Sequence, residues 1–353
     1  MELNPLQYAL LFLAALLSAG VLTPLMRALA FQLDIVDRPI QEHKTHRDPV
    51  PYLGGVAIIL AVFLVVIVGS ALVELGSEIK QTLFIILVPC IFMGIVGLVD
   101  DIKNLTPLSR FLAQTVSGFL AALAITSTDN VGSPTGNNAL DLLISVFWIV
   151  GITNAINFFD NHDGGASGTI AISSLALGAL CFLSNQYYIG ALAFVLAGAS
   201  SGFLIWNRSP ARIYMGDAGS LFLGMLISTL LLRFDPSPIN RWAGFAVPIL
   251  ILALPIMDTS VAVISRIARG LSPFVGGQDH LSHRLVRRGN SRRSTAFTLW
   301  GGTAVFAALA ILISISSYDF EGLLAAASAL LWLVVLAWFY RQDHSPRTTE
   351  SAH

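Results

Sequence analysis

The stretch from Thr82 to Val99 reads TLFIILVPCIFMGIVGLV and runs directly into the pair Asp100-Asp101. A helix needs about 20 mainly apolar residues to cross a bilayer, and this uncharged run comes close to that length. Carboxylates beside hydrocarbon are costly, so they are functional candidates by default. The segment therefore predicts a membrane-spanning helix that brings two acidic side chains to the membrane surface.

Other acidic residues repeat this arrangement. Asp160 and Asp163 follow a second apolar run, and Asp217 comes just before a third. Carboxylates and phosphates are the oxygen ligands that a divalent cation such as Mg²⁺ prefers. Five carboxylates gathered on one side of a membrane therefore predict a site for a divalent cation and phosphate groups.

The composition places the chain among membrane proteins. Of its 353 residues, 55% are hydrophobic and 12% are charged, whereas soluble domains carry about a quarter charged residues. The net charge of -1 gives no basic surface for nucleic acid. Cys90 and Cys181 both lie inside apolar runs, where we expect core residues rather than a disulfide or a metal pair.

We predict an all-α polytopic membrane protein with about eleven spans. The apolar runs lie at 6–30, 54–73, 82–99, 108–127, 140–159, 166–184, 187–206, 218–233, 242–265, 296–316 and 321–340. No soluble domain fits between them, so residues 1–340 are expected to form one integral-membrane domain, followed by a polar tail at 341–353. The first run has no basic segment before it, which indicates a span rather than a cleaved signal peptide.

The positive charges predict the orientation. If the N-terminus lies outside, all but Lys80, Arg233 and Arg241 of the 20 Lys and Arg residues fall on inner loops or the tail. Positive residues favour the cytoplasmic side, so we expect the N-terminus outside and the C-terminus in the cytoplasm. All the acidic motifs then face the cytoplasm.

The acidic motifs also have plainer interpretations. Asp100-Asp101 would be unremarkable at a solvated helix end, but adjacent carboxylates repel and a helix C-terminus disfavours negative charge. Asn154, Asn157 and Asp160 recur at a spacing of three, as does Asp163, which places oxygen ligands along one helix face or merely caps a loop.

Asp217 lies between Gly216 and Gly219 at the expected start of a helix. The carboxylate of Asp217 suits a magnesium ion and the free backbone N–H groups at such a position suit phosphates, although an ordinary helix-capping acid is the alternative.

Three basic or mixed segments are expected on the same side. His280, His283 and Arg284 lie in a long inner loop and suit anionic groups better than zinc, because no third zinc ligand lies nearby. Lys44 lies in a basic turn before the second span, a pattern that also serves topology or lipid headgroups. Asp258 lies within the ninth span, and we favour a structural role for it over a catalytic one.

Two motifs carry a resemblance to a known family: Asn154-Ala-Ile-Asn157-x-x-Asp160-x-x-Asp163-Gly and Met215-Gly-Asp217-x-Gly-Ser-x-x-x-Gly224. Further matches are His46-x-x-Pro-x-Pro-x-x-Gly-Gly, the Asp100-Asp101 pair, Asn104-Leu with Arg110 and Gln114, and Pro-x-x-Asp258. From about Asp37 to about Leu285, these stretches together resemble the polyprenyl-phosphate N-acetylhexosamine-1-phosphate transferases of the glycosyltransferase family 4 type.

The resemblance implies a helical fold of ten or eleven spans in the bacterial inner membrane, with a cytoplasmic active site. It implies transfer of a sugar-1-phosphate from a UDP-N-acetylhexosamine to undecaprenyl phosphate, with release of UMP and use of Mg²⁺, or alternatively Mn²⁺. It is compatible with a homodimer.

The resemblance also implies roles for individual residues. Asp217 looks like the principal metal ligand, with Asn157 as a second, and Tyr214 beside Gly216 occupies the position of a ring that stacks on uracil. Asp100 and Asp101 look like the residues that activate the lipid phosphate, and Asp160 and Asp163 line the nucleotide pocket with Asn154. Lys44, His280, His283 and Arg284 would hold diphosphate or sugar.

The chain departs from the family pattern at three places. Asn161-His162 separates Asp160 from Asp163 where the family usually has Gly-x, Tyr52 replaces a basic residue, and Ser282 takes the place of one histidine. A Pro-Leu-His-His-His run typical of the peptidoglycan branch is absent. This favours a GlcNAc-1-phosphate type of enzyme in O-antigen, teichoic acid or capsule assembly over a phospho-MurNAc-pentapeptide transferase.

Two other classes of protein fit the sequence less well. An ion-coupled transporter would place its acidic residues near the bilayer midplane on broken helices, whereas these carboxylates lie at one edge. A scaffold without activity would have no reason to keep every acidic motif.

Overall fold

The computed structural model describes residues 3–37, 49–128, 135–236, 241–273 and 277–342, and the chain folds there almost entirely into helices. The elements are α1 (Pro5–Gln32), β1 (Val36–Asp37), β2 (Val50–Pro51), α2 (Gly54–Leu72), α3 (Ser77–Lys103), α4 (Pro107–Thr128), α5 (Asn138–Phe159), α6 (Gly165–Leu183), α7 (Tyr187–Asn207), α8 (Gly216–Arg233), α9 (Arg241–Ile251), α10 (Ala253–Ala268), α11 (Leu281–Arg287), α12 (Arg292–Ile315) and α13 (Tyr318–Arg341).

The helices match the predicted spans in order. Within the described ranges, 10 helices are long and apolar enough to cross a membrane, or up to 11 if the bent pair α9–α10 counts as one span. The prediction of an all-α polytopic membrane protein is confirmed. Apolar runs fold this way because hydrocarbon offers no partner for backbone N–H and C=O groups, which a helix satisfies internally.

Helix α8 forms the centre of the bundle, although it was the shortest predicted span. Of its apolar window, 78% is buried, more than for any other span helix in the described residues, and it packs against α3 and α5. Glycines permit this close packing. A Cβ atom at Gly97 of α3 would lie 2.3 Å from the carbonyl oxygen of Asp217, and one at Gly55 of α2 would lie 2.1 Å from the nitrogen of Gly219.

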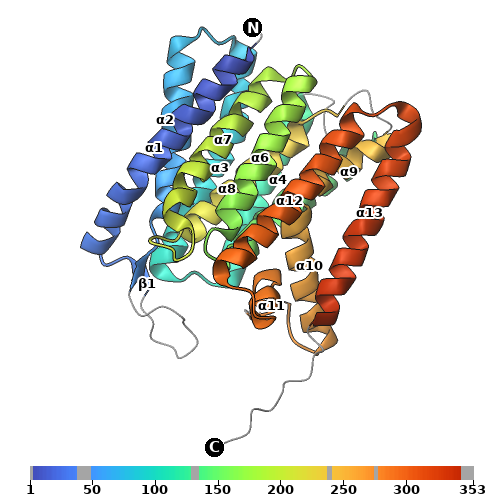
Figure 1. The fold of residues 1–353 in the computed structure, drawn as a ribbon. Helices are drawn as coiled ribbons and strands as arrows, with labels where there is room; N and C mark the ends of the chain where they lie inside the picture. The colour runs from blue at the N-terminus through green and yellow to red at the C-terminus, as the bar shows by residue number, and fades with distance from the viewer. Residues whose placement is uncertain (1–2, 38–48, 129–134, 237–240, 274–276, 343–353) are drawn as a thin grey trace, which may run out of the picture.

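The ninth predicted span is broken. Helices α9 and α10 meet at a bend of 79°, so the expected continuous helix over 242–265 is wrong. Pro255 has no N–H to donate to the carbonyl of Ile251, and Ser173 on α6 donates its hydroxyl to that carbonyl at 2.7 Å instead. The break redirects α10 toward the end of the bundle where α11 lies (Figure 1).

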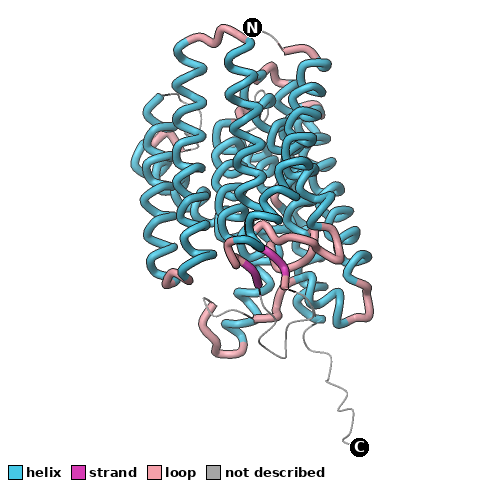
Figure 2. The backbone as a smooth tube through the Cα atoms, turned by 90° about the vertical axis from the view of Figure 1, so that its left-hand side faces the viewer, coloured by secondary structure: helices cyan, strands magenta, loops and turns pink. Residues whose placement is uncertain are grey.

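The functional motifs gather at one end of the bundle. Figure 1 shows α11 and β1 at its lower end, and the C-terminal end of α13 lies there too, opposite the start of α1. Strands β1 and β2 pair antiparallel, with Val36 opposite Pro51, and Figure 2 shows them at this same end among most of the longer loops. Opposite placement of the two ends agrees with an odd number of spans.

Candidate active site

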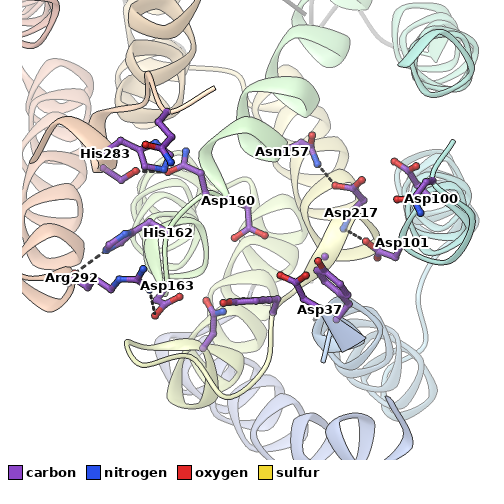
Figure 3. Close-up of a pocket in the computed structure, with 18 of the residues that line it drawn as sticks. Asp37, Asp100, Asp101, Asn157, Asp160, His162, Asp163, Asp217, His283 and Arg292 are labelled. Carbon is purple, nitrogen blue, oxygen red and sulfur yellow. Dashed lines mark hydrogen bonds and ion pairs between the residues drawn. The ribbon is translucent and has the colours of Figure 1, made fainter. Parts of the chain in front are cut away.

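A polar cavity of about 690 Å³ opens at this end of the bundle. Most of the predicted site residues line it: Asp100, Asp101, Asn157, Asp160, Asp163, Tyr214, Gly216, Asp217 and His283. Figure 3 shows two walls, with Asp100, Asp101, Asn157 and Asp217 on one side and Asp163, His162, His283 and Arg292 on the other. Asp160 lies between them. The tertiary structure thus brings residues from at least five elements into one site.

Asp101 caps the N-terminus of α8. Its two carboxylate oxygens accept hydrogen bonds from the backbone N–H of Asp217 at 2.8 Å and of Ala218 at 3.0 Å. These N–H groups belong to the first turn of the helix, which has no internal acceptors for them. Gly216 has a φ of +68°, and a Cβ there would lie 2.6 Å from Asp101. A glycine is therefore needed for this contact.

Asp217 sits in a network of polar side chains. One guanidinium nitrogen of Arg110 lies 2.8 Å from Asp100 and 3.2 Å from Asp217, so it bridges the two carboxylates. The amide of Asn157 donates to Asp217 at 2.6 Å and to Ser220 at 2.9 Å. Asp100 also accepts from the backbone N–H of Leu105 at 2.6 Å. These contacts fix the position of Asp217 at the edge of the cavity.

Asp160 has a different environment. No hydrogen bond to its carboxylate is formed within the part of the chain that the structure describes, and Figure 3 shows it pointing into the cavity between the two walls. Burial raises the pKa of Asp160 well above its ordinary value, and the negative charges of Asp217, Asp101 and Asp163 raise it further. A carboxyl group placed in this way favours a proton or a cation.

The second wall is built around the start of α6 and the start of α12. Arg292 forms an ion pair with Asp163 at 3.8 Å, and its carbonyl oxygen lies 2.8 Å from Nε2 of His162. Asp163 also accepts from the backbone N–H of Ala211 at 3.2 Å. Burial lowers the pKa of His162, and burial together with His280 lowers that of His283 to about 4. Both imidazoles are therefore neutral at pH 7.

Asn207 joins the two loops that frame the cavity. Its side-chain oxygen accepts from the backbone N–H of Gly164 at 3.0 Å and from Ser167 at 2.9 Å. Its side-chain nitrogen donates to the carbonyl of Ile213 at 3.0 Å. The loop after α5 and the loop before α8 therefore hold a fixed relative position, although 40 to 50 residues of chain separate them.

Two tyrosines line the cavity beside the small sheet. The rings of Tyr52 and Tyr214 have centroids 6.1 Å apart, and the backbone N–H of Tyr214 donates to the carbonyl of Pro51 at 2.8 Å. Burial and the neighbouring Asp37 raise the pKa of Tyr52, so its phenol is protonated at neutral pH. Both rings line the cavity, and an aromatic surface of this kind suits a planar base.

Three predicted site residues do not line the cavity. Asn154 donates to Gln114 on α4 at 2.5 Å, and His280 lies 2.7 Å from Asp258. Arg284 is 1% exposed, and it donates to Ser265 at 2.6 Å and to the carbonyl of Phe339 at 3.0 Å.

The polar groups of these three side chains are turned to other helices rather than into the cavity, so their expected contact with substrate stays a prediction without support from the structure. The expectation for Lys44 lies outside the described residues.

The contacts of Asp258 agree with the structural role that the sequence favours. It is fully buried, and its carboxylate accepts from the backbone N–H of Leu281 at 2.7 Å and contacts Nδ1 of His280 at 2.7 Å. Asp258 on α10 therefore anchors the start of α11. Arg266 of the same helix and Arg269, just after its end, both pair with Asp279, just before α11.

The cavity also contains residues to which the sequence gave no role. Arg287, Arg292, His162 and Asp37 all line it. The two arginines lie in a positively charged inner loop, where side chains that bind ligands cannot be distinguished from those that set topology. His162 was visible as a departure inside the acidic motif, which is the one signal that pointed to it.

The donor set fits a magnesium ion held jointly with substrate. Within the described ranges, no three histidine, cysteine or acidic side chains converge as a ready-made metal cage. Mg²⁺ is nevertheless often held by one or two carboxylates together with phosphate oxygens. Asp217, 27% exposed on its side chain and in contact with Asn157, is placed for this.

Comparison with known proteins agrees with this geometry. The model of glycosyl transferase family 4 matches residues 83–235. The probable undecaprenyl-phosphate N-acetylglucosaminyl 1-phosphate transferase of Bacillus subtilis is 30% identical over 333 residues, which cover 93% of this chain and 87% of the relative. The decaprenyl-phosphate N-acetylglucosaminephosphotransferase of Mycobacterium leprae is 29% identical, with 86% and 83% covered.

A phospho-N-acetylmuramoyl-pentapeptide-transferase of Listeria welshimeri is 29% identical over 63% of this chain and 72% of its own length. The resemblance found in the sequence motifs is thereby confirmed. The motifs of that resemblance, the helical bundle and the extent of the match to the Bacillus relative lead to one conclusion: this chain belongs to glycosyl transferase family 4.

Proposed function

We propose that the protein transfers an N-acetylhexosamine-1-phosphate from a UDP-sugar to undecaprenyl phosphate and releases UMP. The observation that carries this proposal is the joining of an acidic wall and a wall with Arg287 and Arg292 in one cavity at the ends of membrane helices. Two phosphates that react with each other must have their charge neutralised. A cavity at the membrane edge is reached by a lipid phosphate from one side and by a nucleotide from the other.

The residues of the acidic wall would place the reacting phosphates. Asp217 and Asn157 would hold Mg²⁺, or alternatively Mn²⁺, which when bound would offset the phosphate charge and stabilise the phosphoryl transition state. Arg110 keeps Asp100 and Asp217 in register. Tyr214 would stack on the uracil ring, with Asp160 and Asp163 along the nucleotide path.

The role of the Asp100-Asp101 pair needs revision at one residue. Asp101 uses both carboxylate oxygens to accept N–H groups of α8, so we assign it to positioning Asp217 rather than to accepting a proton from the lipid phosphate. Asp100 is also engaged by Arg110 and Leu105. Asp160 has no such donor in the described residues, which makes it the better placed proton acceptor.

The expected setting is a bacterial inner membrane, with the cavity and the C-terminus facing the cytoplasm. The distribution of Lys and Arg supports this orientation. Fused after His353, a reporter that works only in the cytoplasm should be active, and a reporter that works only in the periplasm should be inactive. The reverse result would refute the orientation. A homodimer, with which the resemblance is compatible, also stays a proposal, which the mass of the detergent-purified protein would test.

The deciding experiment is UMP release by the purified protein in detergent with undecaprenyl phosphate. The donors should include UDP-GlcNAc, UDP-GalNAc and UDP-MurNAc-pentapeptide, with Asp217→Asn as the inactive control. Release with UDP-GlcNAc supports the proposal, whereas release with the pentapeptide donor alone would assign the chain to the peptidoglycan branch. Flux of an ion into proteoliposomes without UMP release would show a transporter instead.

A further inference from the structure

A hydrogen bond joins the loop after α5 to α11 within the wall of the cavity that carries His162 and His283. Asn161, in the loop after α5, accepts a hydrogen bond at its side-chain oxygen from the hydroxyl of Ser282 on α11. The two residues are 121 positions apart in the chain, and both line the cavity. Ser282 is 2% exposed, so water competes little for this contact and the bond is stronger than it would be at a surface.

Both partners are held in place by other contacts. The side-chain nitrogen of Asn161 donates to the carbonyl of Phe158 at 2.6 Å, which turns its oxygen toward α11. On the other side, the first turn of α11 is fixed by Asp258 through the backbone N–H of Leu281, and its far face by Arg284. The bond therefore links the loop after α5 to α11 and fixes the position of the one against the other.

The neighbours of the two partners face the cavity. Asp160 precedes Asn161 and His283 follows Ser282, and both line the cavity. The wall formed by Asn161, Ser282 and His283 carries no charge at neutral pH, because burial keeps the imidazole of His283 unprotonated. Neutral donors and acceptors of this kind suit hydroxyl and acetamido groups of a sugar rather than phosphate.

We propose that the Asn161–Ser282 hydrogen bond fixes the shape of this uncharged wall around the sugar of the donor and thereby determines which N-acetylhexosamine is accepted. This inference rests on the proposed transferase function. The two residues position the loop after α5 against α11 and contribute to donor selectivity, whereas the phosphate chemistry belongs to the wall around Asp217.

The test compares kcat/KM for UDP-GlcNAc and for its 4-epimer UDP-GalNAc, measured as UMP release by the full-length protein. Ser282→Ala and Asn161→Ala should each change the ratio of the two values by roughly 3- to 10-fold, the scale of one hydrogen bond. The double variant should change it no more than either single variant, because both changes remove the same bond. The Mg²⁺ concentration for half-maximal rate should stay as in the wild type.

Two controls separate selectivity from folding. Ser282→Thr keeps the hydroxyl and should keep the wild-type ratio. Ser265→Ala removes a partner of Arg284 behind α11, so it should lower the melting temperature without changing the ratio. If Ser282→Ala is active with an unchanged ratio, or if the effects of the two substitutions multiply in the double variant, this inference is wrong while the proposed function stands. No UMP release by the wild type with any donor would overturn the proposed function with it.

Discussion

The carboxylate of Asp101 holds the backbone amide of Asp217 at 2.8 Å, across 116 residues of chain. One helix end thus caps the start of another, and the capped residue is the one that we propose as the metal ligand. The glycine at position 97 lets α3 come close enough to α8 for this contact. The position of Asp217 is therefore set by a residue that the sequence suggested as a catalyst.

Asp101→Asn tests this relationship. The amide can accept one α8 N–H group but turns an NH₂ group toward the other, which leaves two donors facing each other. Asp217 should shift, so we expect weaker Mn²⁺ binding by electron paramagnetic resonance and an activity loss of at least about 10²-fold that high Mg²⁺ partly restores. Complete loss of activity with unchanged Mn²⁺ binding would show that Asp101 acts as the base after all.

Asp217→Asn removes the charge that would hold the metal ion. Turnover should fall by at least about 10²-fold, the usual scale for losing a metal ligand, while the melting curve stays close to that of the wild type. Excess EDTA should abolish UMP release by the wild type. Asp319→Asn removes an exposed charge at the start of α13 and should leave turnover unchanged. Activity that persists in EDTA would contradict the proposed metal site.

Tyr214→Ala should weaken binding of the UDP-sugar more than the chemical step. Loss of an aromatic contact costs roughly 1–2 kcal/mol, which corresponds to a rise in KM of about 5- to 30-fold with kcat little changed. Tyr214→Phe keeps the ring and should behave like the wild type. A large fall in kcat at unchanged KM would assign this tyrosine to the chemistry.

Asp258→Asn should mainly lower stability. The buried carboxylate accepts from Leu281 and contacts His280, and an amide would leave a donor without an acceptor at a cost of about 1–3 kcal/mol. We expect a lower melting temperature in detergent, with UMP release per folded molecule retained. Ser260→Ala on the same helix, which removes one bond to the carbonyl of Ile256, should melt near the wild type. A stable but inactive Asp258→Asn protein would mean that the site includes α10.

The contribution of His283 to the stability of the protein should fall as pH drops below about 6.5. His283 has a folded pKa of about 4, lowered by burial and by His280, while the unfolded chain binds a proton near 6.5. Between these values the unfolded state holds more protons, so acid favours unfolding by on the order of 2 kcal/mol from this residue. His162 shifts in the same direction.

His283→Gln removes this contribution. The melting temperature of the variant should drop less between pH 7.5 and pH 5 than that of the wild type. An equal or larger drop in the variant would show that His283 is not buried in its neutral form.

The sequence by itself determined the helices and the chemical type of the site. Long apolar runs become helices in a membrane because each backbone group must find its partner within the run, so ten of the spans were predicted near their observed places. The placing of Asp100, Asp160 and Asp217 at the ends of those runs is also a local property, readable without any contact. The break at Leu252 had a local signal in Pro248 and Pro255, but hydropathy alone did not separate the two helices.

Only the tertiary structure decided which polar side chains face the cavity. Arg284 and Arg287 are one helical turn apart, yet the first is buried against α10 and α13 and the second lines the cavity. The capping of α8 by Asp101 and the bond between Asn161 and Ser282 likewise join residues more than 100 positions apart. A polar side chain in a membrane protein takes the partner that packing brings within reach, and that partner depends on how the helices cross rather than on the neighbouring sequence.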